Sequence, residues 1–302
     1  MTADSKSPDR GPPAARAATI VYLTGLAMLA FAANSLLTRA AFQASSIDAA
    51  SFTAIRIASG AFALCLIVLA QGATLPLSRK RGWPAFLLFA YVAAFSFAYR
   101  DISVGAGALI LFAAAQLTMI SYGVLRGERA SILGMSMAIG GIAAFLAPGA
   151  SAPPLGPTAL MAVAGLAWGA FSLTGKSGDA PVAGTASSFL LALPMSLLLL
   201  LAYRSHVQID LAGALYAALS GALASGVGYA IWYWVRVRMT AISAGAVQLS
   251  VPVISAILGM VFLDERITPG RAIAALVVLA GVAVVTLTAR RKQAARQADA
   301  RG

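Results

Sequence analysis

Long runs of apolar residues dominate the chain and limit its fold more than any other feature. Ten such runs are bounded by charged residues or by Pro and Gly; they cover residues 19–41, 49–70, 84–99, 104–125, 130–148, 157–175, 184–203, 211–233, 241–262 and 270–289. A transmembrane helix needs about 20 mostly apolar residues. Residues 274–285 do not alternate between apolar and polar side chains, which argues against the strands of a membrane barrel. The sequence therefore predicts an all-α integral membrane protein with ten transmembrane helices.

The composition excludes several other classes of protein. The 302 residues are 60% hydrophobic and only 11% charged, with a mean hydropathy of +0.85. A soluble domain is typically about 45–50% apolar and about 25% charged. A single cysteine, Cys65, cannot form an internal disulfide, and a single histidine, His206, leaves no His-based metal site. The sequence has no Walker A, H-E-x-x-H or G-x-S-x-G motif, so we expect neither an enzyme nor a bound cofactor or metal.

The distribution of Lys and Arg predicts the orientation in the membrane. With the N-terminus in the cytoplasm, 16 of the 22 basic residues lie on the cytoplasmic side and 5 on the other, and Arg56 lies within a span. Lys and Arg accumulate in cytoplasmic loops. We therefore expect a multi-pass protein of a bacterial inner membrane with both termini in the cytoplasm. The net charge of +12 comes from residues that flank the spans, so it favours contact with anionic lipids over nucleic-acid binding.

The two halves of the sequence resemble each other. Residues 25–31 match residues 165–171 at five of seven positions, and two shorter matches occur in the same order, each at an offset of 137 residues. The repeat unit contains five helices, and an odd number forces the second unit to cross the membrane in the opposite direction. Inverted repeats are typical of secondary transporters with a site between the halves. The expected organisation is an N-terminal tail (1–18), a first repeat (19–148), a periplasmic linker (149–156), a second repeat (157–289) and a basic cytoplasmic tail (290–302).

Over residues 19–289 the chain resembles the drug/metabolite transporter superfamily, specifically a tandem EamA-type exporter. The resemblance is carried by the ten helices, by the residues that open the second half, by two acidic-basic turns and by an Arg in the second helix; these are Gly165-Leu166-Ala167-Trp168-Gly169, Glu128-Arg129, Asp264-Glu265-Arg266 and Arg56. The second half departs from this pattern, since Leu193 stands where an equivalent Arg would be. The resemblance implies export by alternating access through a central cavity lined mainly by helices 1, 3, 4, 6, 8 and 9. Within the family the chain is most similar to exporters of amino acids, including aromatic ones.

Polar and aromatic side chains near the middle of the spans are the candidate substrate ligands. They are Asn34, Tyr91, Gln116, Trp168, Tyr229 and Gln248. Amides both donate and accept hydrogen bonds, and aromatic faces attract an ammonium group, so together they suit a zwitterion without a fixed charge. The alternative is that these polar groups only bond neighbouring helices to one another.

A second set of residues is assigned to structure or gating: Arg56, Tyr99, Gly221, Trp232 and Pro252. We expect Arg56 to anchor the fold, either by extending to the membrane surface or by binding backbone carbonyls, with substrate contact as the lesser alternative. Tyr99 and Trp232 lie near helix ends, where they form an interfacial belt or gate the cavity. Gly221 permits close helix packing, and Pro252 interrupts a helix.

Every acidic residue of the sequence lies in a tail, a loop or a helix end. Proton-coupled carriers usually place a carboxylate at mid-membrane, so we expect facilitated diffusion without obligatory proton coupling. The alternative substrates are other small amphipathic metabolites or drugs, and the alternative of another class is a non-transporting membrane sensor or scaffold. The sequence leaves open the substrate ranking, the resting state and the oligomeric state, and it is compatible with a monomer.

Overall fold

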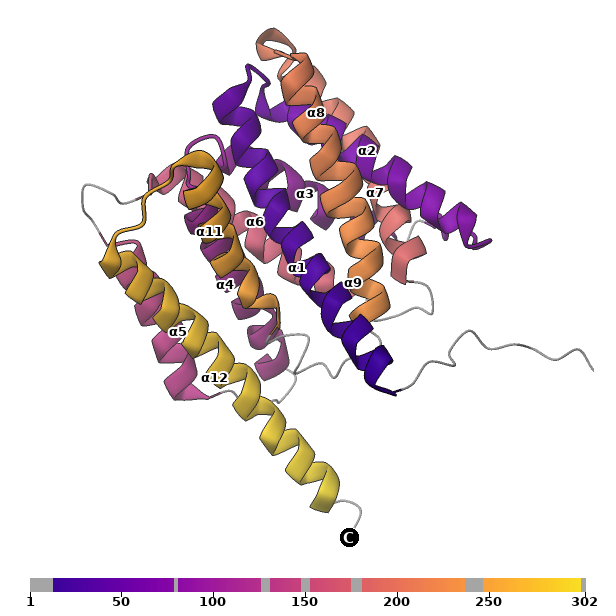
Figure 1. Cartoon of the computed structure of the whole chain (residues 1–302). Coiled ribbons are helices and arrows are strands. Elements are labelled where there is room, and N and C mark those ends of the chain that lie inside the picture. The colour runs from indigo at the N-terminus through magenta and orange to yellow at the C-terminus, as the bar shows by residue number, and fades with distance from the viewer. Residues whose placement is uncertain are drawn as a thin grey trace, which may run out of the picture.

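The computed structural model describes residues 13–78, 81–125, 131–147, 153–174, 181–236 and 247–299, and these residues are almost entirely helical (Figure 1). The α-helices are α1 (Pro13–Ala44), α2 (Ala49–Ala70), α3 (Gly82–Ala98), α4 (Val104–Leu125), α5 (Ile132–Phe145), α6 (Leu155–Thr174), α7 (Pro181–Ala202), α8 (Leu211–Leu219), α9 (Gly228–Arg236), α11 (Ser250–Leu263) and α12 (Pro269–Asp299). A 3-10 helix, η2 (Arg204–His206), precedes α8, and a π-helix, η3 (Ser220–Val227), joins α8 to α9. No strand occurs in these described ranges.

The helices are long and apolar enough to cross a bilayer many times. Within the described residues six helices qualify by length and hydropathy, the longest being Ala18–Ala44. Four shorter apolar helices add Gly82–Ala98, Ile132–Phe145, Ser250–Leu263 and Pro269–Val285. Large apolar side chains on the outer faces are exposed, among them Leu198 at 64% and Val261 at 69%. A bilayer covers such faces without cost, so the predicted all-α, multi-pass membrane fold is confirmed.

Most helix boundaries agree with the predicted spans, and both ends of the chain differ from the prediction. Helix α1 begins at Pro13, inside the expected N-terminal tail, and α12 continues to Asp299, inside the expected C-terminal tail. Proline is favoured at a first helical position, and the residues after the last span are rich in strong helix formers. Helix α5 has only 14 residues, against the 19 of its predicted span. The Glu128-Arg129 turn and residues 241–246 of the predicted ninth span lie outside the described residues.

When each helix of the first half is replaced by the corresponding helix of the second half, and vice versa, the main helix pairs that pack together stay the same. Helix α6 packs on α3 and α4, and correspondingly α1 packs on the α8–η3–α9 segment and on α11. Three further pairs map onto themselves under the exchange: α2 with α7, α4 with α11, and α5 with α12. Figure 1 shows α5 beside α12 and α4 beside α11. The packing therefore fits two five-helix units related by a two-fold exchange.

Two aspartates link the halves at the end of the bundle where α2 and α8 begin. Each carboxylate caps its own helix with one oxygen. The other oxygen accepts a backbone N–H across the interface, from Gln208 to Asp48 at 2.9 Å and from Ser46 to Asp210 at 3.0 Å. The backbone N–H groups of Ser46 and Gly213 lower the pKa of Asp210 from its ordinary value. Both turns are thus held by the side chains that start the following helices.

Candidate functional site

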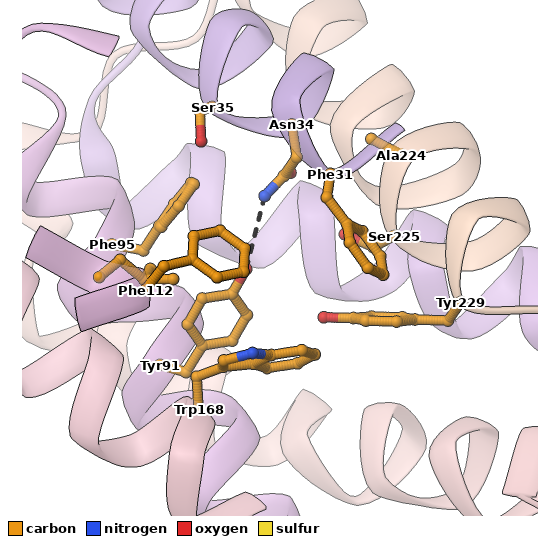
Figure 2. A pocket seen from close by; sticks show the side chains of 11 residues that line it. Phe31, Asn34, Ser35, Tyr91, Phe95, Phe112, Trp168, Ala224, Ser225 and Tyr229 are labelled. Atoms are coloured by element: carbon orange, nitrogen blue, oxygen red, sulfur yellow. Dashed lines mark hydrogen bonds between the residues drawn. The ribbon is translucent and has the colours of Figure 1, made fainter. Parts of the chain in front are cut away.

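A pocket lies between the halves and is lined by residues of six helical elements. Its lining residues are Phe31, Asn34 and Ser35 of α1, Tyr91 and Phe95 of α3, Leu111 and Phe112 of α4, Trp168 of α6, Ala224 and Ser225 of η3, and Tyr229 of α9 (Figure 2). Tyr91 is the tenth of the 17 residues of α3, so the pocket lies near the middle of that helix. Its cavity volume is small, about 20 Å³, and the remaining space between its lining atoms includes open solvent.

Aromatic rings form one wall of the pocket. The rings of Trp168 and Tyr229 stack with centroids 5.4 Å apart and an interplanar angle of 21°. Tyr91 lies against the same indole at 5.1 Å, and Phe31 lies 5.7 Å from Tyr229. Figure 2 shows the rings of Trp168 and Tyr229, seen nearly edge-on, along one side of the pocket. Such a wall packs an apolar or aromatic side chain and attracts an ammonium group.

A chain of hydrogen bonds forms the opposite, polar wall. Ser220 donates to the Asn34 Oδ1 atom at 2.7 Å, and the Asn34 amide nitrogen donates to the Tyr91 hydroxyl at 3.4 Å. The Arg56 Nη2 atom donates to the same hydroxyl at 3.0 Å and to the Ser225 hydroxyl at 3.5 Å. The wall therefore joins α1, α2, α3 and η3 through side chains alone.

Arg56 is fully buried, with an exposed fraction of 0%. Its guanidinium lies 4.7 Å from the ring centroid of Phe95 and 5.3 Å from that of Tyr91. Among the described residues its hydrogen bonds are to side chains, so there it neither extends to the membrane surface nor binds backbone carbonyls, the two expected arrangements. Helix η3 packs closely on α2 and places the Ser225 hydroxyl 3.5 Å from the Arg56 Nη2 atom.

The buried charge of Arg56 is only partly compensated. Within the described part of the chain, its Nε and Nη1 atoms have no hydrogen-bond partner. Removing an ion from water costs several kcal/mol, whereas a cation–π contact contributes roughly 0.5–2 kcal/mol. The polar wall therefore carries a positive charge with unused donors beside a pocket that we expected to be uncharged.

A π-helix shapes the wall at Ser225. Segments of this type, with hydrogen bonds from residue i to i+5, often occur at functional sites. The residue that allows the close approach is Gly221, where a Cβ would meet the Arg56 carbonyl and the Ser59 hydroxyl. Ser225 of this π-helix both lines the pocket and accepts a hydrogen bond from Arg56.

Four of the six candidate substrate ligands line the pocket, namely Asn34, Tyr91, Trp168 and Tyr229. Gln116 is buried on α4 but lies four residues beyond Phe112, and therefore one helical turn farther along the same face. Gln248 is half-buried just before α11 and does not line the pocket either. The absence of α11 from the lining also differs from the six-helix cavity that the family resemblance implied.

The apolar lining residues were missed by the sequence analysis. Phe31, Leu111, Phe112 and Ala224 resemble ordinary core residues, so no chemical signal distinguishes them. Phe95 had a weak signal, because it lies one turn from Tyr91 on the same face of α3.

The candidate gating residues occupy different surroundings. Tyr99 is fully buried rather than in an interfacial belt, and its hydroxyl donates to the Val104 carbonyl at 3.2 Å. Trp232 is 6% exposed and its ring contacts that of Phe31 at 6.0 Å. Pro252 lies in the first turn of α11, separated by a turn at Leu249 from the helical residues 247–248. A proline has no N–H to bond the carbonyl four residues earlier, at Gln248, so the helical bonding is interrupted just before α11.

A charged cluster closes the bundle where α4 begins. The Glu265 carboxylate accepts the Val104 backbone N–H at 2.8 and 3.0 Å, and the Arg39 Nε atom lies 3.7 Å from it. Arg39 also donates to the backbone carbonyls of Tyr99 and Arg100. Burial raises the pKa of Glu265, and the Val104 N–H and Arg39 oppose that rise. The cluster joins α1, the α3–α4 turn and the α11–α12 turn, and the sequence indicated it only as part of a family motif.

Comparisons with known proteins agree with this architecture. The model of the EamA-like transporter family matches residues 157–287. An uncharacterized protein of Pseudomonas aeruginosa, PA1977, is 50% identical over 282 residues, which cover 92% of this chain and 97% of that protein. The chain in a solved crystal structure of a protein is 21% identical to this chain. The two superpose with a TM-score of 0.65 over 90% of this chain and 99% of the other, which shows a shared fold. The family match shows that the chain carries a domain of the EamA-like transporter family, which is part of the drug/metabolite transporter superfamily.

Proposed function

We propose that the chain is a secondary transporter that exports amino acids, including aromatic ones, across the bacterial inner membrane by alternating access. The family supplies the coarser statement, which is a membrane transporter of small molecules. The observation that carries the finer one is the pocket itself, with stacked rings on one wall and hydrogen-bonding groups on the other. An aromatic amino acid has the same division between a ring and a polar head. The sequence resemblance to the aromatic amino-acid exporter YddG supports the same substrate class.

The transport step is proposed to be facilitated diffusion. The carboxylates of Asp48, Asp101, Asp210, Asp264 and Glu265 all lie at helix ends or in turns of the described structure. A proton-coupled carrier usually holds a carboxylate at mid-membrane. The substrate would then move down its own gradient as the two halves rock about the pocket.

Counterflow in proteoliposomes tests the proposal. Purified protein is reconstituted, the vesicles are loaded with unlabelled L-phenylalanine, and entry of labelled phenylalanine is followed with empty liposomes as the control. We expect transient accumulation of label that depends on the protein. Counterflow of drugs alone would support the alternative substrate class, and absence of flux for every amino acid and drug would favour a sensor or scaffold. Uphill transport driven by an imposed pH gradient would refute facilitated diffusion.

A further inference from the structure

Arg56 presents an unusual electrostatic situation for a residue at this depth in a membrane protein. The side chain is fully buried in α2, and its Nε and Nη1 atoms lack partners among the described residues. A guanidinium stays charged in proteins and presents donors in a planar fork that matches a carboxylate. Buried charges in membrane spans are normally paired, and an unpaired one indicates a functional site.

The described chain supplies no counter-charge to Arg56. The ion pair found in the described residues joins Arg39 to Glu265 at the end of the bundle, and no described carboxylate pairs with Arg56. The groups around the guanidinium are the rings of Tyr91 and Phe95 and the hydroxyls of Tyr91 and Ser225. These residues also line the pocket, so a molecule in the pocket contacts the same side chains that surround the guanidinium.

We propose that Arg56 is the anion anchor of the pocket and that the carboxylate of the transported molecule supplies the missing counter-charge. The inference rests on the proposed transport function and deepens it, because it makes a carboxylate a requirement for transport. Arg56 does not itself line the pocket, whereas the Tyr91 and Ser225 hydroxyls, 3.0 and 3.5 Å from its Nη2 atom, both do, so the carboxylate would displace these two acceptors to reach the guanidinium. Its apolar or aromatic group then lies against Trp168 and Tyr229.

The surroundings favour a monocarboxylate over a phosphate. A phosphate group carries up to two negative charges and is usually held by several cationic groups. Arg56 is the one cation in contact with the lining residues of the described pocket, and the lining itself contains no charged residue. A cationic drug is excluded for the opposite reason, since it would bring a second positive charge next to an uncompensated one.

A set of phenyl compounds that differ only in their charged groups tests the inference on the wild-type protein. The set contains L-phenylalanine, 3-phenylpropionate, L-phenylalanine amide and phenethylamine. Each compound is used to compete with labelled phenylalanine in counterflow, and its binding to detergent-purified protein is measured separately by thermal stabilisation. We expect phenylalanine and phenylpropionate to compete and bind, and the two compounds without a carboxylate to be at least tenfold weaker. Equal potency of the amide or of phenethylamine would overturn the inference.

Two variants separate an anchor from a structural role. Arg56→Gln should weaken the two carboxylates at least tenfold while leaving the two cationic compounds unchanged or improved, and Arg56→Lys should restore part of the preference for carboxylates. The matched control is Arg204→Gln, which removes an exposed Arg of η2 far from the pocket lining and should keep the wild-type order of potencies. If Arg56→Gln loses all four compounds alike, or fails to fold, the wild-type series decides. Binding of carboxylates without any flux would refute transport but support the anchor, whereas flux that ignores the carboxylate would refute the anchor alone.

Discussion

Replacing Gly221 by alanine should separate η3 from α2 and destabilise the bundle. A Cβ at this position would lie 2.9 Å from the Arg56 carbonyl carbon and closer still to the Arg56 oxygen and the Ser59 hydroxyl. Two of these atoms are backbone, so a change of rotamer cannot relieve the overlap. Forcing an extra carbon into a packed interior costs typically about 1–3 kcal/mol.

The effect is measured as a shift of the melting temperature. For a large domain, 1 kcal/mol corresponds to roughly 2–4 °C, so we expect Gly221→Ala to melt roughly 2–12 °C below the wild type in the same detergent. The matched control is Gly25→Ala in α1, where a Cβ meets no atom within 4 Å. Alanine is favoured over glycine in a helix by about 0.5–1 kcal/mol, so this control should melt at or above the wild-type temperature. Equal melting temperatures for the two variants would refute the packing argument.

Three further predictions concern the pocket and the ends of the bundle. Trp168→Leu removes the indole that stacks on Tyr229, so it should weaken phenylalanine roughly threefold to tenfold and leucine little, as measured by competition in counterflow; an equal loss for both would contradict the aromatic wall. Glu265→Gln should remove a pH dependence of the melting temperature. Burial raises the pKa of Glu265, so the protonated carboxyl stabilises the folded state below the ordinary pKa of 4.5, and this stabilisation is lost as pH rises through the raised pKa. A wild-type profile without that loss would contradict the assignment. Asp210→Asn should lower the melting temperature at neutral pH and reduce the fall of the melting temperature on acidification. Because the pKa of Asp210 is lowered, its carboxylate stabilises the fold at pH values above the ordinary pKa, and this stabilisation is lost as pH falls through the lowered pKa. Identical acid profiles for variant and wild type would refute this.

The sequence predicted those residues of the candidate site whose polar side chains cost free energy when placed inside a membrane. Asn34, Tyr91 and Trp168 stand out because polar or amphipathic groups at bilayer depth need a partner or a cavity, and all three line the pocket. The same reasoning selected Gln116, which lies on the correct face of α4 but one turn beyond Phe112. Position along a helix therefore needs the packed structure, because sequence periodicity defines the face but not the depth of a shared cavity.

Hydropathy and spacing by themselves determined the all-helical membrane fold and most helix boundaries. This is possible because the bilayer demands long apolar segments whose backbone is satisfied within each helix. Only the tertiary structure decided the role open to Arg56. A sequence shows that a charge lies within a span, whereas its burial, its partners and its unused donors depend on the packing of η3 at Gly221 against α2, in contacts between residues more than 160 positions apart.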